Sequence, residues 1–202
     1  MRIVRSALFL GAGLVALNAT ATTGSAQTPT GAPAPADAPT AGYRAEFLRE
    51  LEYLESRFVS LAEQMPAEKY TWRPAEGVRS VGEVFLHVAG ANYSLTRRIG
   101  TPPPSGFQGQ GFDKSTTEKA KVVDHLKQSF AHMRTAALKA ADADADKTMP
   151  WFNNSTITQR GFLVFVARHA GEHLGQSIAY ARVNGIVPPW SEEGAQQPQR
   201  RP

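Results

Sequence analysis

Apolar residues recur every three or four positions in four separate segments of this 202-residue chain, and this spacing limits the fold more than any other feature. Residues three and four apart lie on one face of an α-helix, so each segment predicts an amphipathic helix with one buried face. No strand signal accompanies them. We therefore expect an all-α fold, a four-helix bundle. The repeating positions are Phe47, Leu51, Leu54, Phe58, Leu61 and Met65; Val81, Val84, Val88 and Leu95; Val122, Leu126, Phe130, Met133 and Ala137; and Phe162, Val166, His169, His173, Gln176 and Tyr180.

Capping patterns and helix-breaking residues predict where these helices begin and end. A Ser or Thr followed three residues later by Glu or Gln is typical of a helix start. Pro and Gly near the last turn are typical of a stop. The predicted starts are Ser80-x-x-Glu83, Ser115-x-x-Glu118 and Thr156-x-x-Gln159, and the predicted stops are Pro66, Gly100 with prolines 102–104, and Asn184-Gly185 with Pro188-Pro189. The ADADAD stretch predicts a turn, and the Gly-rich SGFQGQGFD stretch predicts a plain loop.

The two ends of the chain are expected to lie outside the bundle. Residues 1–26 combine two arginines, a short apolar run and small residues, which predicts a secretory signal peptide cleaved after Ala26, with Ala19 and Ala21 as weaker alternatives. Residues 27–42 are rich in Pro, Ala and Thr and predict a flexible linker. The bundle is expected over 43–190, and 191–202 as a disordered tail. We therefore expect an exported protein, periplasmic or secreted.

Charge and cysteine content exclude several classes of protein. Cleavage would remove Arg2 and Arg5 and no acidic residue, which lowers the formal net charge from +4 to +2. No helix carries a one-sided stripe of Lys and Arg, so nucleic-acid binding is not expected. The chain has no cysteine. Disulfides and a lipid-modified cysteine are thus excluded, and no membrane anchor is expected after signal cleavage.

Three histidines are the candidate metal ligands. His169 and His173 lie one helical turn apart on the apolar face of the fourth helix, where two imidazoles can reach one ion. His87 lies on the inner flank of the second helix. Three neutral imidazoles on a divalent ion leave a coordination position open, as in catalytic metal sites. Hydrogen-bonded core histidines are the alternative, and on the pair alone the two interpretations are equally good. His125 and His132 are expected at the surface or at the boundary of the core.

One competing motif is rejected. His169-Ala-Gly-Glu172-His173 matches the H-x-x-E-H string of inverzincin peptidases. That chemistry needs a further carboxylate ligand well downstream, where only a short tail with Glu192 and Glu193 follows. Glu172 can instead approach a metal held by the histidines, or it can face water.

The chain resembles the DinB-like family of metal-binding four-helix bundles. The resemblance is carried by YTWRPAEGVRSVGEVFLHVAGANYSL around His87, by RHAGEHLGQ around His169 and His173, and by YARVNGIVPPW at the end. It implies that these three histidines bind one divalent metal ion, usually zinc or nickel. It also implies that the protein is a possible homodimer. Some family members catalyse transfer to, or isomerisation with, low-molecular-weight thiols.

The leading hypothesis is therefore a metal-dependent enzyme that acts on an unknown small molecule by thiol transfer, isomerisation or hydrolysis. Glu172, Gln176 and Tyr180 are the candidates to orient a bound water or the substrate. Trp72, Trp151 and Phe152 either line a pocket or cover the core. Two alternatives stay open: an exported protein that sequesters or senses metal, and a structural bundle whose histidines bond to one another.

Overall fold

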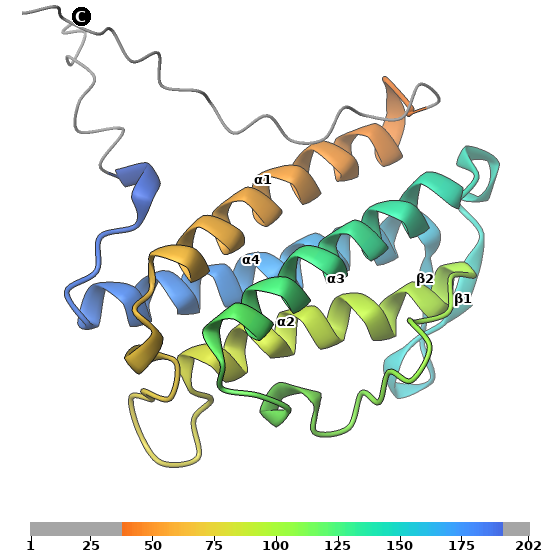
Figure 1. Ribbon diagram of the computed structural model, residues 1–202. Helices are drawn as coiled ribbons and strands as arrows, with labels where there is room; N and C mark the ends of the chain where they lie inside the picture. Colours follow the sequence, from red (N-terminus) through yellow and green to blue (C-terminus); the bar gives the residue numbers. More distant parts are fainter. Residues whose placement is uncertain (1–37, 192–202) are drawn as a thin grey trace, which may run out of the picture. The chain divides into compact units, whose positions relative to one another are not determined.

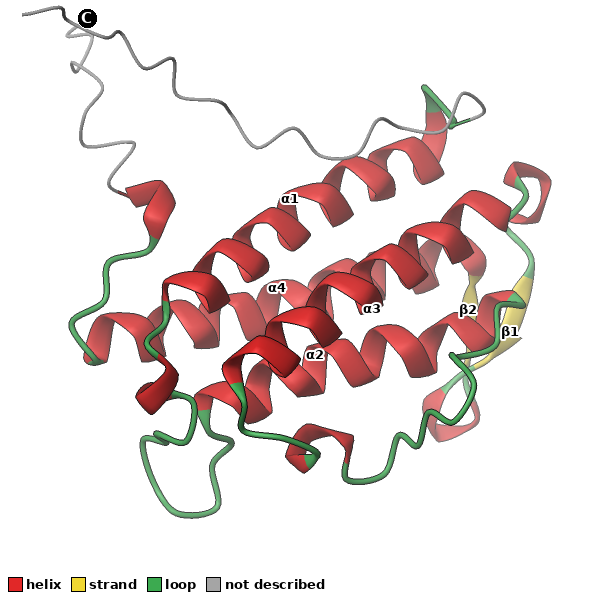
Figure 2. Ribbon diagram, viewed as in Figure 1, coloured by secondary structure: helices red, strands yellow, loops and turns green. Residues whose placement is uncertain are grey.

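A computed structural model describes residues 38–191 and shows four long helices (Figures 1 and 2). They are α1 (Gly42–Gln64), α2 (Val81–Leu95), α3 (Lys119–Lys139) and α4 (Gln159–Val183). The predicted all-α four-helix bundle is confirmed. The predicted signal peptide, most of the linker and the tail after Ser191 lie outside the described residues. No helix within 38–191 is both long and apolar enough to cross a membrane.

The order of the helices around the bundle differs from their order along the chain. Helix α1 packs against α3 and α4, and α2 packs against the same two helices, so α1 and α2 occupy opposite corners. Short loops would favour neighbouring positions for consecutive helices. Here α2 instead lies beside α4, and this contact brings His87 to the helix that carries the other two histidines.

The core is built from the predicted apolar faces. Phe58 of α1 lies between Phe85 of α2 and Phe130 of α3, with ring centroids 6.4 and 5.8 Å away. All three side chains are fully buried. Burying an aromatic side chain of this size contributes about 1.5–3 kcal/mol, so these rings are a main source of the bundle's stability.

The predicted helix start at Ser80 and the predicted stop at Gly185 are confirmed, and two other predicted starts are wrong. Ser80 and Glu83 form the capping box of α2, and Gly185 adopts the left-handed conformation expected after α4 (φ 75°). In contrast, α3 begins only at Lys119, because Ser115 ends the preceding 3₁₀ turn. The N-cap of α4 is Thr158, whose hydroxyl accepts the Gly161 N–H at 3.1 Å.

A small antiparallel hairpin corrects the expectation that strands are absent. Strands β1 (Thr148–Pro150) and β2 (Thr156–Thr158) pair in the register Thr148 to Thr158. Asn153 and Asn154 lie between them with φ of 55° and 58°, a left-handed conformation that Asn tolerates better than most residues. Three residues are too few for an alternating pattern to stand out, so this hairpin could not be predicted from the spacing of apolar residues.

Within the described part of the chain, five 3₁₀ turns complete the connections. They are η1 (Ala67–Lys69), η2 (Thr96–Ile99), η3 (Phe112–Lys114), η4 (Asp142–Asp144) and η5 (Phe152–Asn154). The expected turn at ADADAD is η4, and Gly100 ends η2 with φ 83°. The Gly-rich loop ends in η3, which packs against α2. This loop is therefore more than a plain connection, since Phe112 of η3 fills the space above Gly90.

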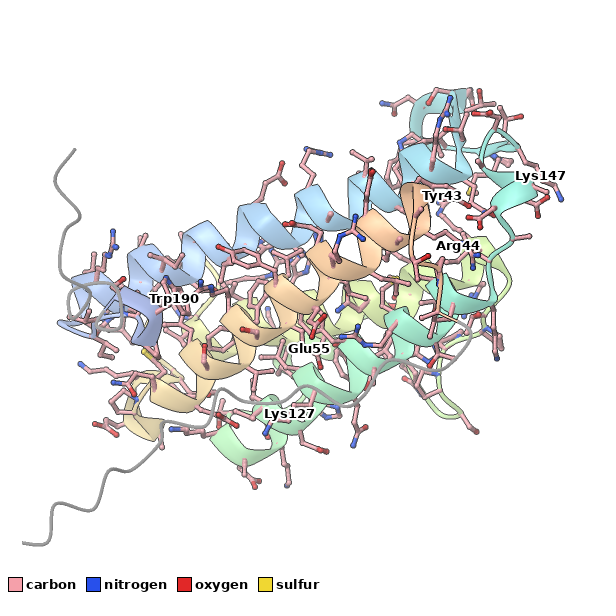
Figure 3. The ribbon with its side chains drawn as sticks, turned by 90° about the horizontal axis from the view of Figure 1, so that it is seen from above. Tyr43, Arg44, Glu55, Lys127, Lys147 and Trp190 are labelled. Atoms are coloured by element: carbon pink, nitrogen blue, oxygen red, sulfur yellow. The ribbon has the colours of Figure 1, made fainter. Side chains whose placement is uncertain are left out.

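Polar contacts tie α1 to the rest of the bundle (Figure 3). The Arg44 guanidinium bonds both carboxylate oxygens of Asp142 at 2.7 and 2.8 Å. Near the other end, Lys127 of α3 pairs with Glu63 at 2.7 Å, and the Arg57 guanidinium lies 4.7 Å from the Trp190 ring centroid. Both ends of α1 are thus fixed to later parts of the chain.

Candidate metal centre

His87, His169 and His173 converge between α2 and α4. His87 lies in the middle of α2, which begins at the capping box of Ser80 and Glu83. His169 and His173 lie one turn apart on α4 and face α2. The tertiary contact between these helices therefore brings together two sites that are more than 80 residues apart along the chain.

The three imidazoles are close enough to bind a single ion. One ligand nitrogen from each side chain lies within 4.8 Å of the other two. The Nε2 atoms of His87 and His169 are 3.2 Å apart. Two nitrogens at the zinc–nitrogen bond length of a tetrahedral site are separated by about 3.3 Å. The donor set thus fits a divalent metal, and the separation of His87 and His169 already matches that of two ligands on one ion.

A chain of hydrogen bonds orients His173. Its Nδ1 donates to Gln176 Oε1 at 2.9 Å, Gln176 Nε2 donates to the Tyr180 hydroxyl at 2.8 Å, and that hydroxyl donates to the Arg79 carbonyl at 3.3 Å. The amide oxygen can only accept, so the proton is held on Nδ1 and the lone pair is left on Nε2. Fixing the tautomer of a histidine in this way is the usual role of the groups behind a metal ligand.

Two of the imidazoles are held in the neutral form. Burial lowers the pKa of His87 to about 4, with further lowering by the charge of Arg79 and by the other two histidines. Burial also lowers the pKa of His169 to about 4, and the neighbouring His173 adds to this effect. Neutral imidazoles keep a lone pair available, which a metal requires.

Two hollows open near the candidate metal centre, and one of them has a histidine in its wall. The first, about 340 Å³, lies between α2 and the Gly-rich loop and includes His87, Gly90 and Phe112 in its wall. The second, about 500 Å³, reaches Gln176. Arg79 and Asp113 line both hollows and pair with each other, with Arg79 Nε 3.0 Å from Asp113 Oδ2. The first hollow therefore gives a small molecule access to His87, and the second gives access to Gln176 behind His173.

The three predicted orienting residues lie in different settings. Gln176 and Tyr180 belong to the hydrogen-bond chain behind His173. Glu172 is exposed and accepts a hydrogen bond from Arg168 at 2.6 Å, one turn back along α4. Its carboxylate is therefore engaged by Arg168 in this conformation, and its role in catalysis stays a prediction.

The three predicted aromatic residues cover helices and do not line either hollow. Trp72 packs edge-on against Tyr180, with ring centroids 5.4 Å apart. Trp151 packs against Phe165 at 4.8 Å, and Phe165 stacks on His169 at 6.1 Å. Phe152 is half exposed beside Trp151. Trp72 and Trp151 thus contact the histidine cluster through Tyr180 and Phe165.

The two remaining histidines lie at the boundary of the core, as expected. His125 packs against Phe112, and His132 Nε2 lies 3.0 Å from the Thr96 hydroxyl. Both side chains are half-buried. They are separate from the three-histidine cluster.

Arg79 and Asp113 were missed by the sequence interpretation. Arg79 directly precedes the capping serine of the helix that carries His87. This position in the sequence is the one feature that could have identified Arg79 as a residue near the site. Asp113 lies in the loop that was expected to be a plain connection. Nothing local in the sequence indicates that these two residues, 34 positions apart, form a pair at the mouth of the site.

Comparisons with known proteins agree with this geometry. The family model of the DinB superfamily matches residues 50–177, a range that contains all three histidines. A DinB-like protein from Bacillus cereus has a similar fold, with a TM-score of 0.62, 19% identity, and coverage of 71% of this chain and 93% of that one. The search of curated proteins found no significant match.

A second solved structure, YfiT from Bacillus subtilis, is described as a probable metal-dependent hydrolase with an unusual four-helix bundle topology. Its TM-score is 0.58 and its identity 16%, with coverage of 79% of this chain and 97% of that one. At these identities the structural likeness shows the fold alone. The family match covers well over half of the chain and includes the histidine cluster, and the chain therefore belongs to the DinB superfamily.

Proposed function

We propose that this chain is an exported metal-dependent hydrolase that holds one divalent ion, zinc or nickel, through His87, His169 and His173. The observation that carries the proposal is the convergence of three ligand nitrogens within 4.8 Å, two of them on imidazoles kept neutral by burial. Hydrolysis is preferred to thiol transfer and isomerisation because YfiT is described as a probable metal-dependent hydrolase. Export follows from the predicted signal peptide, and a homodimer from the family resemblance.

The residues of the site would have different roles in the reaction. When bound, a divalent ion supplies a Lewis acid that activates water and polarises the bond to be cleaved. Gln176 keeps the proton on His173 Nδ1, and Tyr180 fixes the amide of Gln176. These two residues act through His173 and are positioning residues. The hollow beside His87 gives a substrate room next to this ligand, which a protein that only sequesters metal does not need.

Elemental analysis of the mature protein, beginning at Gln27, tests the metal site. We expect about one zinc or nickel ion per chain, and loss of that ion in the His169→Ala/His173→Ala double variant with the far-UV circular dichroism retained. His132→Ala is the matched control, because this half-buried histidine lies outside the cluster and should leave the metal content unchanged. Wild-type protein that neither contains nor binds zinc or nickel would contradict the proposal.

Hydrolysis is tested with chromogenic carboxylate and phosphate esters. Activity should disappear after chelation, return on adding the metal, and be absent in the double variant. Activity that survives chelation would contradict the proposal that hydrolysis takes place at this metal site. Light scattering of the same sample tests the homodimer.

The Gln176→Leu variant tests the orienting hydrogen bond. Leu fills a similar volume but leaves His173 Nδ1 without its acceptor. Loss of a group that orients a metal ligand weakens metal affinity by about 10–100-fold, and competition with a metal indicator measures this change. Unchanged affinity would show that Gln176 does not fix the tautomer of His173.

A further inference from the structure

Arg79 is held rigidly at the edge of the candidate metal centre. Its backbone carbonyl accepts the Tyr180 hydroxyl, and its Nε donates to Asp113 Oδ2 at 3.0 Å. It also directly precedes the N-cap of α2. The base of the side chain and one side of the guanidinium are therefore fixed from two directions, by α4 and by η3.

The outer edge of the same guanidinium is free. Within residues 38–191, the two Nη groups of Arg79 form no hydrogen bond, and 41% of the side chain is exposed. The residue lines both hollows, one shared with His87 and the other with Gln176. Two parallel N–H donors therefore remain available at the mouth of the site, in the geometry that matches a planar oxyanion.

The charged residues that line the second hollow favour the binding of a group with one negative charge. The charged residues that line the second hollow are Arg73, Arg79 and Lys114 against Glu83 and Asp113, a balance of +1. Arg73 is already paired with Glu83 and Arg79 with Asp113, so among these five residues the surplus positive charge is that of Lys114. The charge of Arg79 reaches the cluster, since it lowers the pKa of both His87 and His169. A carboxylate, with a single charge, fits this balance better than a phosphate dianion.

We propose that Arg79 determines substrate specificity by binding a carboxylate of a small anionic substrate through its free Nη edge, while Asp113 holds the guanidinium in place. This inference rests on the proposed function, because the substrate is the one that reaches the three histidines. The reacting group of the substrate then lies toward His87, and its carboxylate toward Arg79.

Two thiols that differ only in charge provide the test. The mature protein is loaded with cobalt(II), and the thiolate-to-cobalt absorption is titrated with 3-mercaptopropionate and with the uncharged 3-mercaptopropionamide. We expect the wild type to bind the acid about tenfold more tightly, the lower end for hydrogen bonds to a charged group. In Arg79→Gln the two affinities should agree within about twofold, with cobalt stoichiometry unchanged.

Arg168→Gln is the matched control. Arg168 adjoins His169 and also lowers its pKa, but it lines neither hollow. The Arg168→Gln variant should still bind the acid more tightly than the amide. This result would distinguish direct contact between Arg79 and the carboxylate from a general effect of nearby positive charge. Equal binding of both thiols by the wild type, or a preference retained in Arg79→Gln, would overturn this inference and leave the metal site standing. Failure to bind cobalt would overturn the proposed function and this inference with it.

Discussion

Acidification of the metal-free protein is expected to destabilise the bundle through His87 and His169. Burial lowers the pKa of both imidazoles from 6.5 to about 4. The unfolded chain therefore binds protons that the folded chain rejects. The resulting decrease in the free energy of unfolding is absent above the unfolded pKa, grows as the pH falls below 6.5, and becomes constant below about pH 4.

The size of the effect follows from these two values. At about pH 5, each unfolded imidazole is almost fully protonated and each folded one is mostly neutral. The difference corresponds to about 2 kcal/mol per histidine for a fully buried group, at about 1.4 kcal/mol per pKa unit. Both side chains are only half-buried, so solvent screening reduces this to about 1 kcal/mol each. The pair should lower the free energy of unfolding by about 2 kcal/mol.

Urea unfolding followed by circular dichroism, with a chelator present, measures this change between about pH 7.5 and pH 5. Other groups also titrate in this range. The His87→Gln/His169→Gln double variant supplies the baseline, since its pH dependence lacks both imidazoles. The difference in unfolding free energy between wild type and variant should shift by about 2 kcal/mol against the wild type. A difference that does not change with pH, or that shifts toward the wild type, would refute the reasoning.

Four further substitutions test the stability of the bundle, each measured by thermal or urea unfolding. Phe130→Ala should cost about 3–5 kcal/mol, because this fully buried ring packs against α1, and a cost below about 1 kcal/mol would contradict its place in the core. Ser80→Ala should cost about 1 kcal/mol through loss of the capping box, and an unchanged stability would argue against that cap. Gly171→Ala should stabilise α4 by about 0.5–1 kcal/mol, since nothing lies within 4 Å of the added methyl group. Gly90→Ala should be less stable than Gly171→Ala, because its methyl group would lie 3.0 Å from Phe112, and the reverse order would show that this loop yields freely.

The parts of the fold that depend on local spacing were predictable from the sequence. The repeat of apolar residues every three or four positions predicts four helices because helical geometry alone puts those residues on one face. The pairing of His169 with His173 has the same origin, since one turn of helix brings any two such residues together. Gly185 after α4 and the capping box at Ser80 likewise depend only on residues within one turn.

Predictions failed where a neighbouring element competes for the same residues. Thr156 and Gln159 have the spacing of a helix start, but Thr156 pairs with Pro150 in the hairpin, and the helix begins after Thr158. Ser115 ends the 3₁₀ turn η3, so α3 starts later than its capping pattern predicts. In both cases a contact outside the helix decides the boundary.

The sequence alone identified the candidate metal ligands, because imidazole pairs on an apolar face are unusual enough to mark a candidate ligand set. Only the tertiary structure decided that His87 reaches them, since this requires α2 to lie beside α4 and opposite α1. The same is true of the pair between Arg79 and Asp113, which depends on how the Gly-rich loop folds back on α2. Local periodicity fixes the direction of a side chain on its own helix, whereas the packing of one helix on another fixes what that side chain meets.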